Sequence, residues 1–421
     1  MKKLQLIITV FLILALTACS SGAAIPAAEQ TPAAVSEQGA APIRTEAPVQ
    51  KPEPPRADMP ETDPESAETG TAQEPKAGTD RAGEILDSMS LYEKICQMII
   101  VRPEQLTGTG PVTESGAELE AGLEKWPVGG ILYTLPNLID AAQTDEMTSE
   151  AQRLSRLGLF ICADEEGGNV GRLMYTIGTT WIDSMYSYRE QGTGKAYSNA
   201  LTIGTDMMSH GFNTDFAPVA DVWSNPENKI IGTRAYSDDF NEAAELVSAA
   251  VSGFKSSGVI CSLKHFPGHG NTAEDSHVGM AYTDKSLEEL RSEEYLPFRS
   301  GIDAGADMVM VAHITVTDAD DVPATMSRKI VTEELREYLG FDGVIITDGL
   351  EMAALTKNYT AEEIAVGCIS AGADILLGPV DLEAAVGALK SAVESGEITQ
   401  DQIDTSVRRI LELKLDHGII E

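Results

Sequence analysis

The stretch that decides the fold is Gly343-Val344-Ile345-Ile346-Thr347-Asp348, an unbroken apolar run that ends in a carboxylate. Strands that are buried on both faces of a parallel sheet read as continuous apolar runs of this kind. Seven further runs share this character, and amphipathic helical patterns such as 243–257 and 287–304 separate most of them. Eight strand–helix units predict an α/β protein with a (β/α)8 TIM-type barrel. The eight predicted strands are 97–101, 130–133, 159–163, 214–217, 259–263, 308–312, 343–347 and 373–377.

Polar side chains follow several of these runs at the point where each strand is predicted to end. Asp164 and Glu165 follow the third run, Lys264 and His265 end the fifth, and His313 and Asp348 follow the sixth and seventh. In barrels of this type the carboxyl ends of the strands carry the chemistry. We therefore expect these side chains to converge on one active site.

The overall charge and the cysteines exclude several kinds of function. The chain of 421 residues has a formal net charge of −36, which argues against nucleic-acid binding, because phosphate recognition needs clustered Lys and Arg. We expect a monomer that needs no cofactor. Cys96, Cys162 and Cys261 stand in apolar runs and form no CxxC pair, so we expect buried free thiols and no metal cluster.

The N-terminus carries an export signal. Two lysines precede an apolar run from Leu4 to Leu16, which is too short to remain as a membrane-spanning helix. The sequence Leu16-Thr17-Ala18-Cys19 resembles the lipobox of bacterial lipoproteins. That resemblance implies a signal peptide over residues 1–18 and a lipid on the Cys19 sulfur, which would anchor an extracytoplasmic protein to the cell membrane.

The segment 19–82 has the composition of a disordered tether. Ten of the 20 prolines precede residue 80, and no aromatic residue lies between Phe11 and Tyr92. Such a segment buries too little apolar surface to offset the entropy of ordering it. We assign residues 83–421 to a single catalytic barrel that this tether holds away from the membrane.

Asp348 is the candidate nucleophile. A buried strand would hold its carboxylate rigidly, and Gly349 leaves open space beside it. Retaining glycosidases use a carboxylate in such a position to form a covalent glycosyl-enzyme. Glu351 lies about one helical turn further, and we expect it to cap a helix or to face solvent.

A second segment, Lys264-His265-Phe266-Pro267-Gly268-His269-Gly270-Asn271-Thr272, is followed by Asp275-Ser276-His277 and holds three of the six histidines. Only Asp275 adds an obvious carboxylate to these histidines, so the segment favours acid/base chemistry over metal binding. Asp275 and His277 lie two residues apart, and a turn can bring the carboxylate onto the imidazole, orienting it and raising its basicity. A histidine that only holds the loop in place remains an alternative, more so for His269 than for His277.

Two further segments supply candidate ligand-binding groups. In Asp164-Glu165-Glu166-Gly167-Gly168-Asn169, followed by Arg172, the Asp164 carboxylate can accept hydrogen bonds from sugar hydroxyls and Arg172 can orient it. Arg234 has the forked donor geometry of a ligand-binding residue, although a surface ion pair is equally possible. Asp215 lies inside an apolar strand, where we expect it to satisfy buried backbone or Arg groups.

These four segments, in this order, resemble glycoside hydrolase family 3, in particular its bacterial β-N-acetylhexosaminidases of cell-wall turnover. The resemblance covers about residues 85–421, and the Lys264–Gly270 stretch with Asp275-Ser276-His277 is its most specific part. It implies that Asp348 is the nucleophile, that His277 is the general acid/base and that Asp275 tunes it. It further implies sugar contacts from five residues, namely Asp164, Arg172, Arg234, Lys264 and His265. Asn169 departs from the family pattern, which usually has Arg at this position.

The function implied by the resemblance is the metal-free, retaining release of terminal β-linked N-acetylglucosamine from muropeptides or related glycans. A β-glucosidase or β-xylosidase of the same family is an alternative that the Asp275-Ser276-His277 triplet disfavours. A barrel that binds glycans without turnover is another, which the intact set of candidate catalytic residues disfavours.

Overall fold

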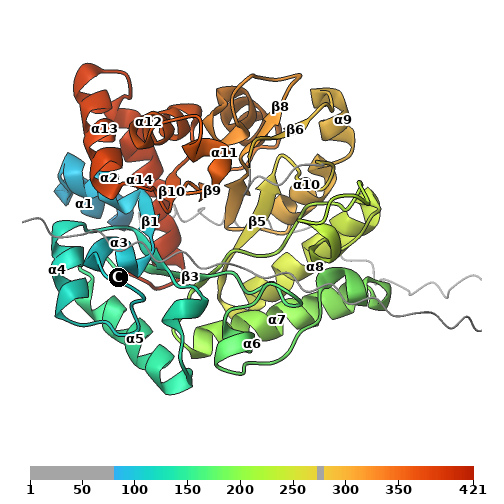
Figure 1. The fold of residues 1–421 in the computed structure, drawn as a ribbon, viewed down its shortest axis with the longest axis horizontal. Helices are drawn as coiled ribbons and strands as arrows, with labels where there is room; N and C mark the ends of the chain where they lie inside the picture. The colour runs from blue at the N-terminus through green and yellow to red at the C-terminus, as the bar shows by residue number, and fades with distance from the viewer. Residues whose placement is uncertain (1–79, 273–278) are drawn as a thin grey trace, which may run out of the picture. The chain divides into compact units, whose positions relative to one another are not determined.

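The structure is a computed structural model that describes residues 80–272 and 279–421. Eight parallel strands close into a barrel in the order β1-β10-β9-β7-β5-β4-β3-β2, and helices surround it (Figure 1). The (β/α)8 fold predicted from the sequence is therefore confirmed. The barrel strands are β1 (Ile99–Val101), β2 (Gly130–Leu132), β3 (Phe160–Ala163), β4 (Thr214–Asp215), β5 (Ile260–Phe266), β7 (Met308–Val311), β9 (Val344–Gly349) and β10 (Ile375–Leu377).

The helices alternate with the strands along the chain. In the described part of the chain, the helical segments of eight residues or fewer are α1 (Arg81–Ser88), α2 (Leu91–Gln97), α3 (Pro103–Thr107), η1 (Leu135–Asn137), α6 (Leu173–Thr176), η2 (Met185–Gln191), η3 (Gly232–Arg234), α9 (Leu287–Ser292), η4 (Ala324–Met326) and α11 (Ala353–Thr356). The longer helices are α4 (Ala117–Lys125), α5 (Ala141–Leu154), α7 (Thr193–Ser209), α8 (Phe240–Ser257), α10 (Tyr295–Asp303), η5 (Lys329–Tyr338, a π-helix), α12 (Ala361–Ala371), α13 (Leu382–Ser395) and α14 (Gln400–Asp416).

The outer helices follow from their apolar periodicity and their caps, as α8 illustrates. Its buried residues include Leu246, Val247, Ala250 and Phe254, which recur at the spacing of one helix face. The Asp239 side chain caps the first turn by accepting from two backbone N–H groups, and Gly258 ends the helix in the left-handed conformation. The helix therefore buries one stripe against the barrel.

Two predicted boundaries are wrong in an informative way. The predicted first strand begins at Gln97, whereas Gln97 ends α2 and donates its side-chain amide to the carbonyl oxygens of Pro127 and Val128. The single helix predicted over 287–304 divides into α9 and α10. The division turns the Glu294 carboxylate inward, where it is buried and accepts from Lys285 Nζ at 2.6 Å.

The two ends of the described chain meet at the outside of the barrel. Figure 1 shows α1, in blue, beside the red C-terminal helices, and an ion pair of 2.8 Å joins Arg408 on α14 to Asp80. Away from the barrel sheet, β6 (Ala281–Thr283) pairs in parallel with β8 (Ile314–Val316). This small sheet connects the segment after β5 to the segment after β7.

The core is apolar and holds four cysteines without a disulfide. Cys96, Cys162, Cys261 and Cys368 are buried free thiols, as predicted for the first three. Burial raises the pKa of each of these thiols, to about 12 for Cys96 and Cys368. No helix in the described part of the chain is long and apolar enough to cross a membrane.

Candidate active site

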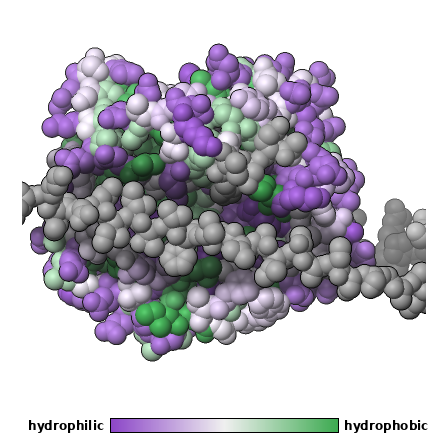
Figure 2. Space-filling view, viewed as in Figure 1, coloured by the Kyte–Doolittle hydropathy of each residue, from purple (hydrophilic) through white to green (hydrophobic). Residues whose placement is uncertain are grey.

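A cavity of about 800 Å³ opens at the carboxyl ends of the barrel strands. Its lining includes all six of the predicted site residues that lie in the described ranges: Asp164, Arg172, Arg234, Lys264, His265 and Asp348. Asp164 follows β3, and Asp348 is the penultimate residue of β9. Lys264 and His265 are among the last three residues of β5. Of the six strand-end side chains expected to converge, Asp164, Lys264, His265 and Asp348 line this cavity. Glu165 and His313 are not among its lining residues, and Glu165 accepts backbone hydrogen bonds from Leu173 and Met174 instead. Figure 2 shows the same face as Figure 1, with many hydrophilic residues around the outline of the barrel.

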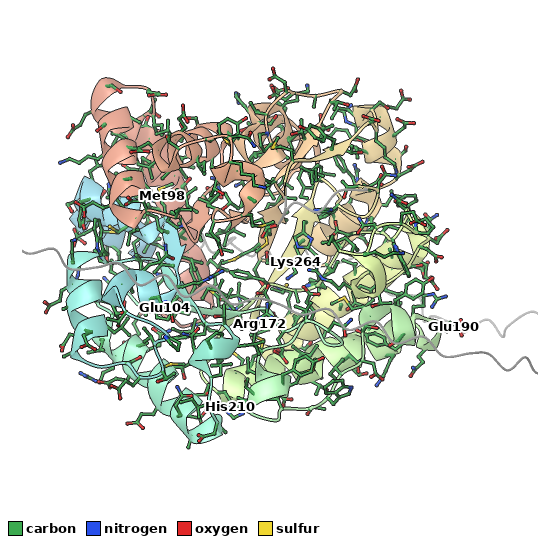
Figure 3. All side chains as sticks on the ribbon, viewed as in Figure 1. Met98, Glu104, Arg172, Glu190, His210 and Lys264 are labelled. Carbon is green, nitrogen blue, oxygen red and sulfur yellow. The ribbon has the colours of Figure 1, made fainter. Side chains whose placement is uncertain are left out.

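Lys264 is the centre of a buried charge cluster. Its ammonium group is only 2% exposed and lies 2.9 Å from Oδ1 of Asp164 and 2.6 Å from Oε1 of Glu166. Burial alone would lower the pKa of Lys264, but the charges of Asp164 and Glu166 raise it. Lys264 therefore enters the cavity as a fixed cation. Figure 3 shows Lys264 and Arg172 toward the centre of the molecule, while His210 and Glu190 lie at its edge.

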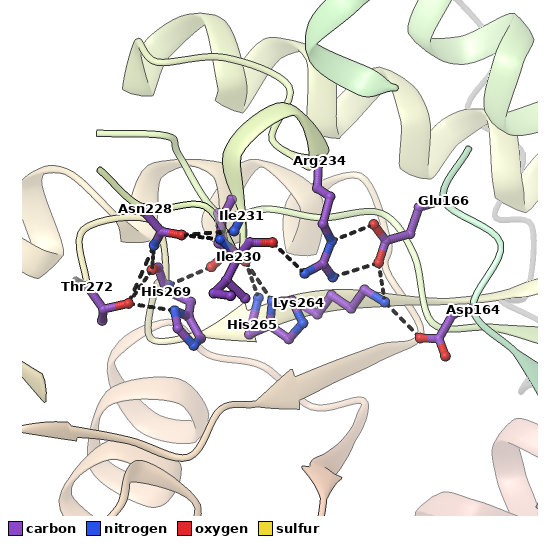
Figure 4. A network of polar contacts seen from close by, with 11 residues as sticks. Asp164, Glu166, Asn228, Ile230, Ile231, Arg234, Lys264, His265, His269 and Thr272 are labelled. Atoms are coloured by element: carbon purple, nitrogen blue, oxygen red, sulfur yellow. Dashed lines mark hydrogen bonds and ion pairs between the residues drawn. The ribbon is translucent and has the colours of Figure 1, made fainter. Parts of the chain in front are cut away.

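Arg234 joins this cluster through Glu166. Its guanidinium binds the carboxylate in a bidentate manner, with Nε at 2.9 Å and Nη2 at 2.7 Å from the two oxygens (Figure 4). Burial would raise the pKa of Glu166, but Arg234 and Lys264 hold that pKa far below its usual range. Arg234 lines the cavity. Its ion pair with Glu166 is not a surface ion pair, because the Glu166 side chain is 1% exposed.

Asp164 is the anionic group of the cluster that remains open to the cavity. Oδ1 accepts from Lys264, and Arg172 Nη2 lies 3.2 Å from Oδ2, yet 22% of the side chain is exposed. Burial would raise the pKa of Asp164, but Lys264 and Arg172 outweigh it and lower that pKa. An ionised carboxylate with open lone pairs can accept hydrogen bonds from two neighbouring hydroxyl groups of a ligand.

His265 is oriented by a buried carboxylate. Its Nδ1 lies 2.7 Å from Oδ2 of Asp221, and the other oxygen of Asp221 accepts from the backbone N–H of His269 at 2.6 Å. Burial would raise the pKa of Asp221, but His265 lowers it, so the carboxylate is ionised and Nδ1 must carry the hydrogen. The Nε2 atom is thereby left for the cavity that His265 lines.

Asp348 lies beside His265 at the end of β9. One carboxylate oxygen accepts from the backbone N–H of Gly349 at 2.7 Å. Within 80–272 and 279–421, no Lys or Arg forms an ion pair with Asp348. Burial would raise the pKa of Asp348, whereas His265 and His313 lower it below its usual value. Asp348 is therefore an ionised carboxylate in the cavity, and no Lys or Arg of the described residues neutralises it through an ion pair.

His313 contacts the backbone at the same end of β9. Its Nε2 lies 2.9 Å from the carbonyl oxygen of Gly349, and its Nδ1 lies 3.0 Å from the hydroxyl of Thr325. A carbonyl only accepts, so Nε2 carries the hydrogen. His313, which the sequence marks as a polar strand end, therefore positions the backbone next to Asp348.

The segment that would carry the acid/base lies outside the described residues, which exclude Asp275 and His277. The described part of the loop is anchored on its N-terminal side. His269 is buried, its Nδ1 lies 2.7 Å from the Thr272 hydroxyl, and its carbonyl oxygen accepts from Asn228 at 2.8 Å. These contacts fit the loop-holding alternative for His269 (Figure 4).

Three site residues were missed or misjudged from the sequence. Glu166 and Asp221 stand in the quoted motifs, but nothing in their local pattern shows that each receives two separate partners. Glu351 is exposed, which agrees with the expectation that it faces solvent. The sequence does not show that it also lines the cavity and forms an ion pair with Arg102.

Asp215 meets its expectation at only one of its two carboxylate oxygens. Asp215 accepts from the backbone N–H of Glu165 at 2.9 Å, as expected, but its second oxygen has no partner in the described part of the chain. Burial raises the pKa of this carboxyl group well above its ordinary value.

The described residues contain no cluster of His, Cys, Asp and Glu that could hold a metal ion. Asn169 lines the cavity, so the departure from the family pattern falls on the cavity wall.

The chain matches the family described as Glycosyl hydrolase family 3 N terminal domain over residues 90–413. The chain belongs to glycosyl hydrolase family 3. This assignment confirms the family resemblance that the sequence motifs indicate.

Its relatives in family 3 include named hexosaminidases. The chain is 34% identical to β-hexosaminidase A of Pseudoalteromonas piscicida over 327 residues, covering 70% of this chain and 55% of the relative. It is 32% identical to β-hexosaminidase of Stenotrophomonas maltophilia (strain K279a), covering 62% of this chain and 81% of the relative. Among solved structures, a family 3 β-N-acetylglucosaminidase from Paenibacillus sp. str. FPU-7 is 36% identical with a TM-score of 0.74, covering 79% of this chain and 63% of that one. The chain thus spans little more than half of the Pseudoalteromonas protein.

Proposed function

We propose that the protein is a retaining exo-β-N-acetylglucosaminidase in which Asp348 is the nucleophile. The observation that carries this proposal is the state of Asp348: an ionised carboxylate with a lowered pKa, held at a strand end inside the cavity and without an ion-pair partner in the described part of the chain. The hexosaminidase relatives support the choice of sugar.

The reaction would proceed in two displacements. A carboxylate oxygen of Asp348 attacks the anomeric carbon while the glycosidic C–O bond breaks and the leaving oxygen receives a proton from the general acid. Water then attacks the same carbon, and the bond between this carbon and Asp348 breaks. The water gives its proton to the residue that acted as general acid in the first step. Two inversions at one carbon give net retention of configuration.

We assign the general acid/base to His277, tuned by Asp275. The assignment rests on the Asp275-Ser276-His277 motif and on the fixed start of the loop that carries it. Sugar hydroxyls would be bound by Asp164 together with Lys264, Arg172, Arg234 and His265, whose polar atoms line the cavity. The ionised Asp164 and the cationic Lys264 offer an acceptor and a donor side by side, which suits a vicinal pair of hydroxyl groups.

The proposal is tested by assaying the release of 4-nitrophenol from its β-N-acetylglucosaminide. Substitution of Asp348→Asn, which keeps the shape of the side chain, should lower kcat by roughly 10⁴-fold or more. Retained activity in a folded variant would contradict the assignment. Parallel assays with the aryl β-glucoside and β-xyloside decide between this activity and the glucosidase and xylosidase alternatives. Glycan binding without turnover of any substrate would indicate a binding protein.

We further propose that the protein is exported and anchored by a lipid on Cys19, and that its substrates are muropeptides or related wall glycans. The support is the lipobox-like sequence and the Pro- and Ala-rich segment that follows it. Expressed in a bacterium, the wild-type protein should partition with membranes, and Cys19→Ser should release it into the aqueous fraction. Mass spectrometry of the mature N-terminus identifies the lipid, and an unmodified Cys19 in membrane-bound protein would contradict the anchor.

A further inference from the structure

A second cavity of about 460 Å³ adjoins the active-site cavity over the end of β1. The two cavities share four lining residues, namely Arg102, Thr134, Glu351 and Gly378. Most of the walls of the second cavity come from the segments that follow β1, β2 and β10, which are neighbouring strands in the barrel, and Glu351 comes from the segment after β9. Because the cavities share a wall, a ligand seated at Asp348 can extend from one into the other.

Hydrogen bonds between these three segments hold the second cavity open. Oε1 of Glu104 accepts from Nδ2 of Asn137 at 2.7 Å, which ties the segment after β1 to the segment after β2. The Gln105 side chain accepts from the backbone N–H of Arg102 at 2.9 Å and donates to the carbonyl oxygen of Pro379, which ties the same segment to the one after β10. The polar side chains of Glu104 and Gln105 thus form hydrogen bonds that hold the wall segments together. Figure 3 shows Glu104 on the α3 side of the centre.

The remaining walls are mostly apolar. Pro111, Pro136, Pro379 and Val380 line the cavity, and Val380 is 58% exposed. Proline rings lose no further rotamer entropy when a ligand packs on them. A wall of this kind fits the C–H faces of a sugar ring or short aliphatic groups.

The charged feature that borders both cavities is the ion pair between Arg102 and Glu351. Two glycines make room for its carboxylate: a Cβ at Gly349 would lie 2.9 Å and one at Gly378 would lie 2.8 Å from Oε2 of Glu351. Arg102 is 45% exposed, and within the described ranges Glu351 is the one partner of its guanidinium. Since a guanidinium carries five donors in a planar fork, Arg102 can hold Glu351 and still bind a second carboxylate.

We infer that the cavity over β1 binds the leaving part of the substrate, and that Arg102 selects a leaving part that bears a carboxylate. This inference rests on the proposed hydrolase function. With a formal net charge of −36, the chain as a whole repels an anionic ligand, so acceptance of a carboxylate needs a fixed cation at the site of contact. Glu351 positions Arg102, and the proline-lined walls receive the apolar parts of the leaving group.

The test compares two disaccharides that differ in the leaving sugar. One is N-acetylglucosamine β-1,4-linked to N-acetylmuramic acid, which bears a carboxylate, and the other is chitobiose, which bears none. Binding of both to the Asp348→Asn protein is measured by titration calorimetry, so that turnover is not required. The expected preference for the carboxylate-bearing disaccharide is about tenfold or more, as for a charge-assisted contact. Adding Arg102→Gln should abolish the preference, whereas Arg102→Lys should retain part of it.

Two controls separate this inference from general effects of charge or folding. Arg153→Gln removes the same charge from an exposed position on α5 and should leave the preference unchanged. Val380→Trp fills the cavity from its exposed edge and should weaken both disaccharides relative to the 4-nitrophenyl substrate in the catalytically intact protein. Equal binding of the two disaccharides to Asp348→Asn, or a preference that survives Arg102→Gln, overturns the inference. A wild-type protein that hydrolyses no N-acetylglucosaminide contradicts the proposed function instead, and the calorimetric comparison still decides the role of Arg102.

Discussion

The substitution Glu166→Gln tests the buried cluster that organises the active site. Oε1 of Glu166 receives both Lys264 and Arg234, and Oε2 receives Nε of Arg234. Whichever oxygen becomes the amide NH₂, at least one donor faces another donor. The variant also leaves Lys264 with Asp164, and Arg234 with Asp221 and Asp164, as the remaining nearby anions.

The magnitude follows from burial, since the Glu166 side chain is 1% exposed. Removing one partner of a buried, hydrogen-bonded ion pair costs about 3–5 kcal/mol of unfolding free energy. At about 2 °C per kcal/mol for a large domain, Tm should fall by roughly 6–10 °C. Differential scanning calorimetry at pH 7 measures this change. Glu150→Gln, which removes an exposed partner of Arg153, is the control and should leave Tm unchanged.

The pH dependence provides a second criterion for the same substitution. The folded pKa of Glu166 lies far below its unfolded value, because Arg234 and Lys264 outweigh burial. Its stabilising contribution is therefore complete above the unfolded pKa of about 4.3 and is lost as the pH falls through the folded pKa. The difference in Tm between wild type and variant should be full at pH 6–7 and smaller below about pH 4. A difference under about 2 °C at pH 7, which corresponds to about 1 kcal/mol, or a difference that grows toward low pH, would refute the reasoning.

Two further predictions concern the acid/base and a buried lysine. His277→Ala should lower kcat/KM by roughly 10²–10⁴-fold on a natural disaccharide but far less on the 4-nitrophenyl glycoside, whose leaving group needs little protonation; equal losses on both would remove the acid role from His277. Lys414 is buried on Gln97 and Gly158, and burial lowers its pKa to about 7. Because its unfolded pKa is about 10.4, the unfolded chain binds more protons between these values, and stability should rise with pH across this window by up to about 1.4 kcal/mol per pH unit. Denaturant unfolding of Lys414→Met should show a shallower rise than wild type, while the exposed Lys390→Met should not; identical slopes in all three proteins would show that Lys414 does not titrate there.

The barrel could be predicted from the sequence because its strands are buried on both faces. A strand such as Val344–Gly349 begins with a continuous apolar run, which favours a strand covered on both faces. Eight such runs with helices between them leave few topologies. The boundary at Gln97 failed because an apolar pattern does not show where hydrogen bonding between strands begins. The division between α9 and α10 was not predicted, because the helical pattern of 287–304 does not show that Glu294 is buried and pairs with Lys285.

The site residues divide in the same way. Asp348 and Lys264 could be placed because each stands directly at the end of a strand, so its location follows from the fold. The partners Glu166 and Asp221 could not, since each acts across loops whose path the local sequence does not determine. Arg102 and Glu351 are 249 residues apart in the chain, and their pairing depends on the closure of the barrel between β1 and β9 through β10.

The four buried cysteines make the barrel a set of internal reporters of its own opening. Cys96 lies in α2, Cys162 in β3, Cys261 in β5 and Cys368 in α12, so the thiols are spread around the barrel. Since burial raises their pKa values and shields them, each should react with an alkylating reagent only when its own region unfolds. Mass spectrometry of alkylated peptides could then rank the regions by local opening without introducing any label. Such a map would show whether the strands that hold Lys264 and Asp348 open independently or only when the whole barrel unfolds.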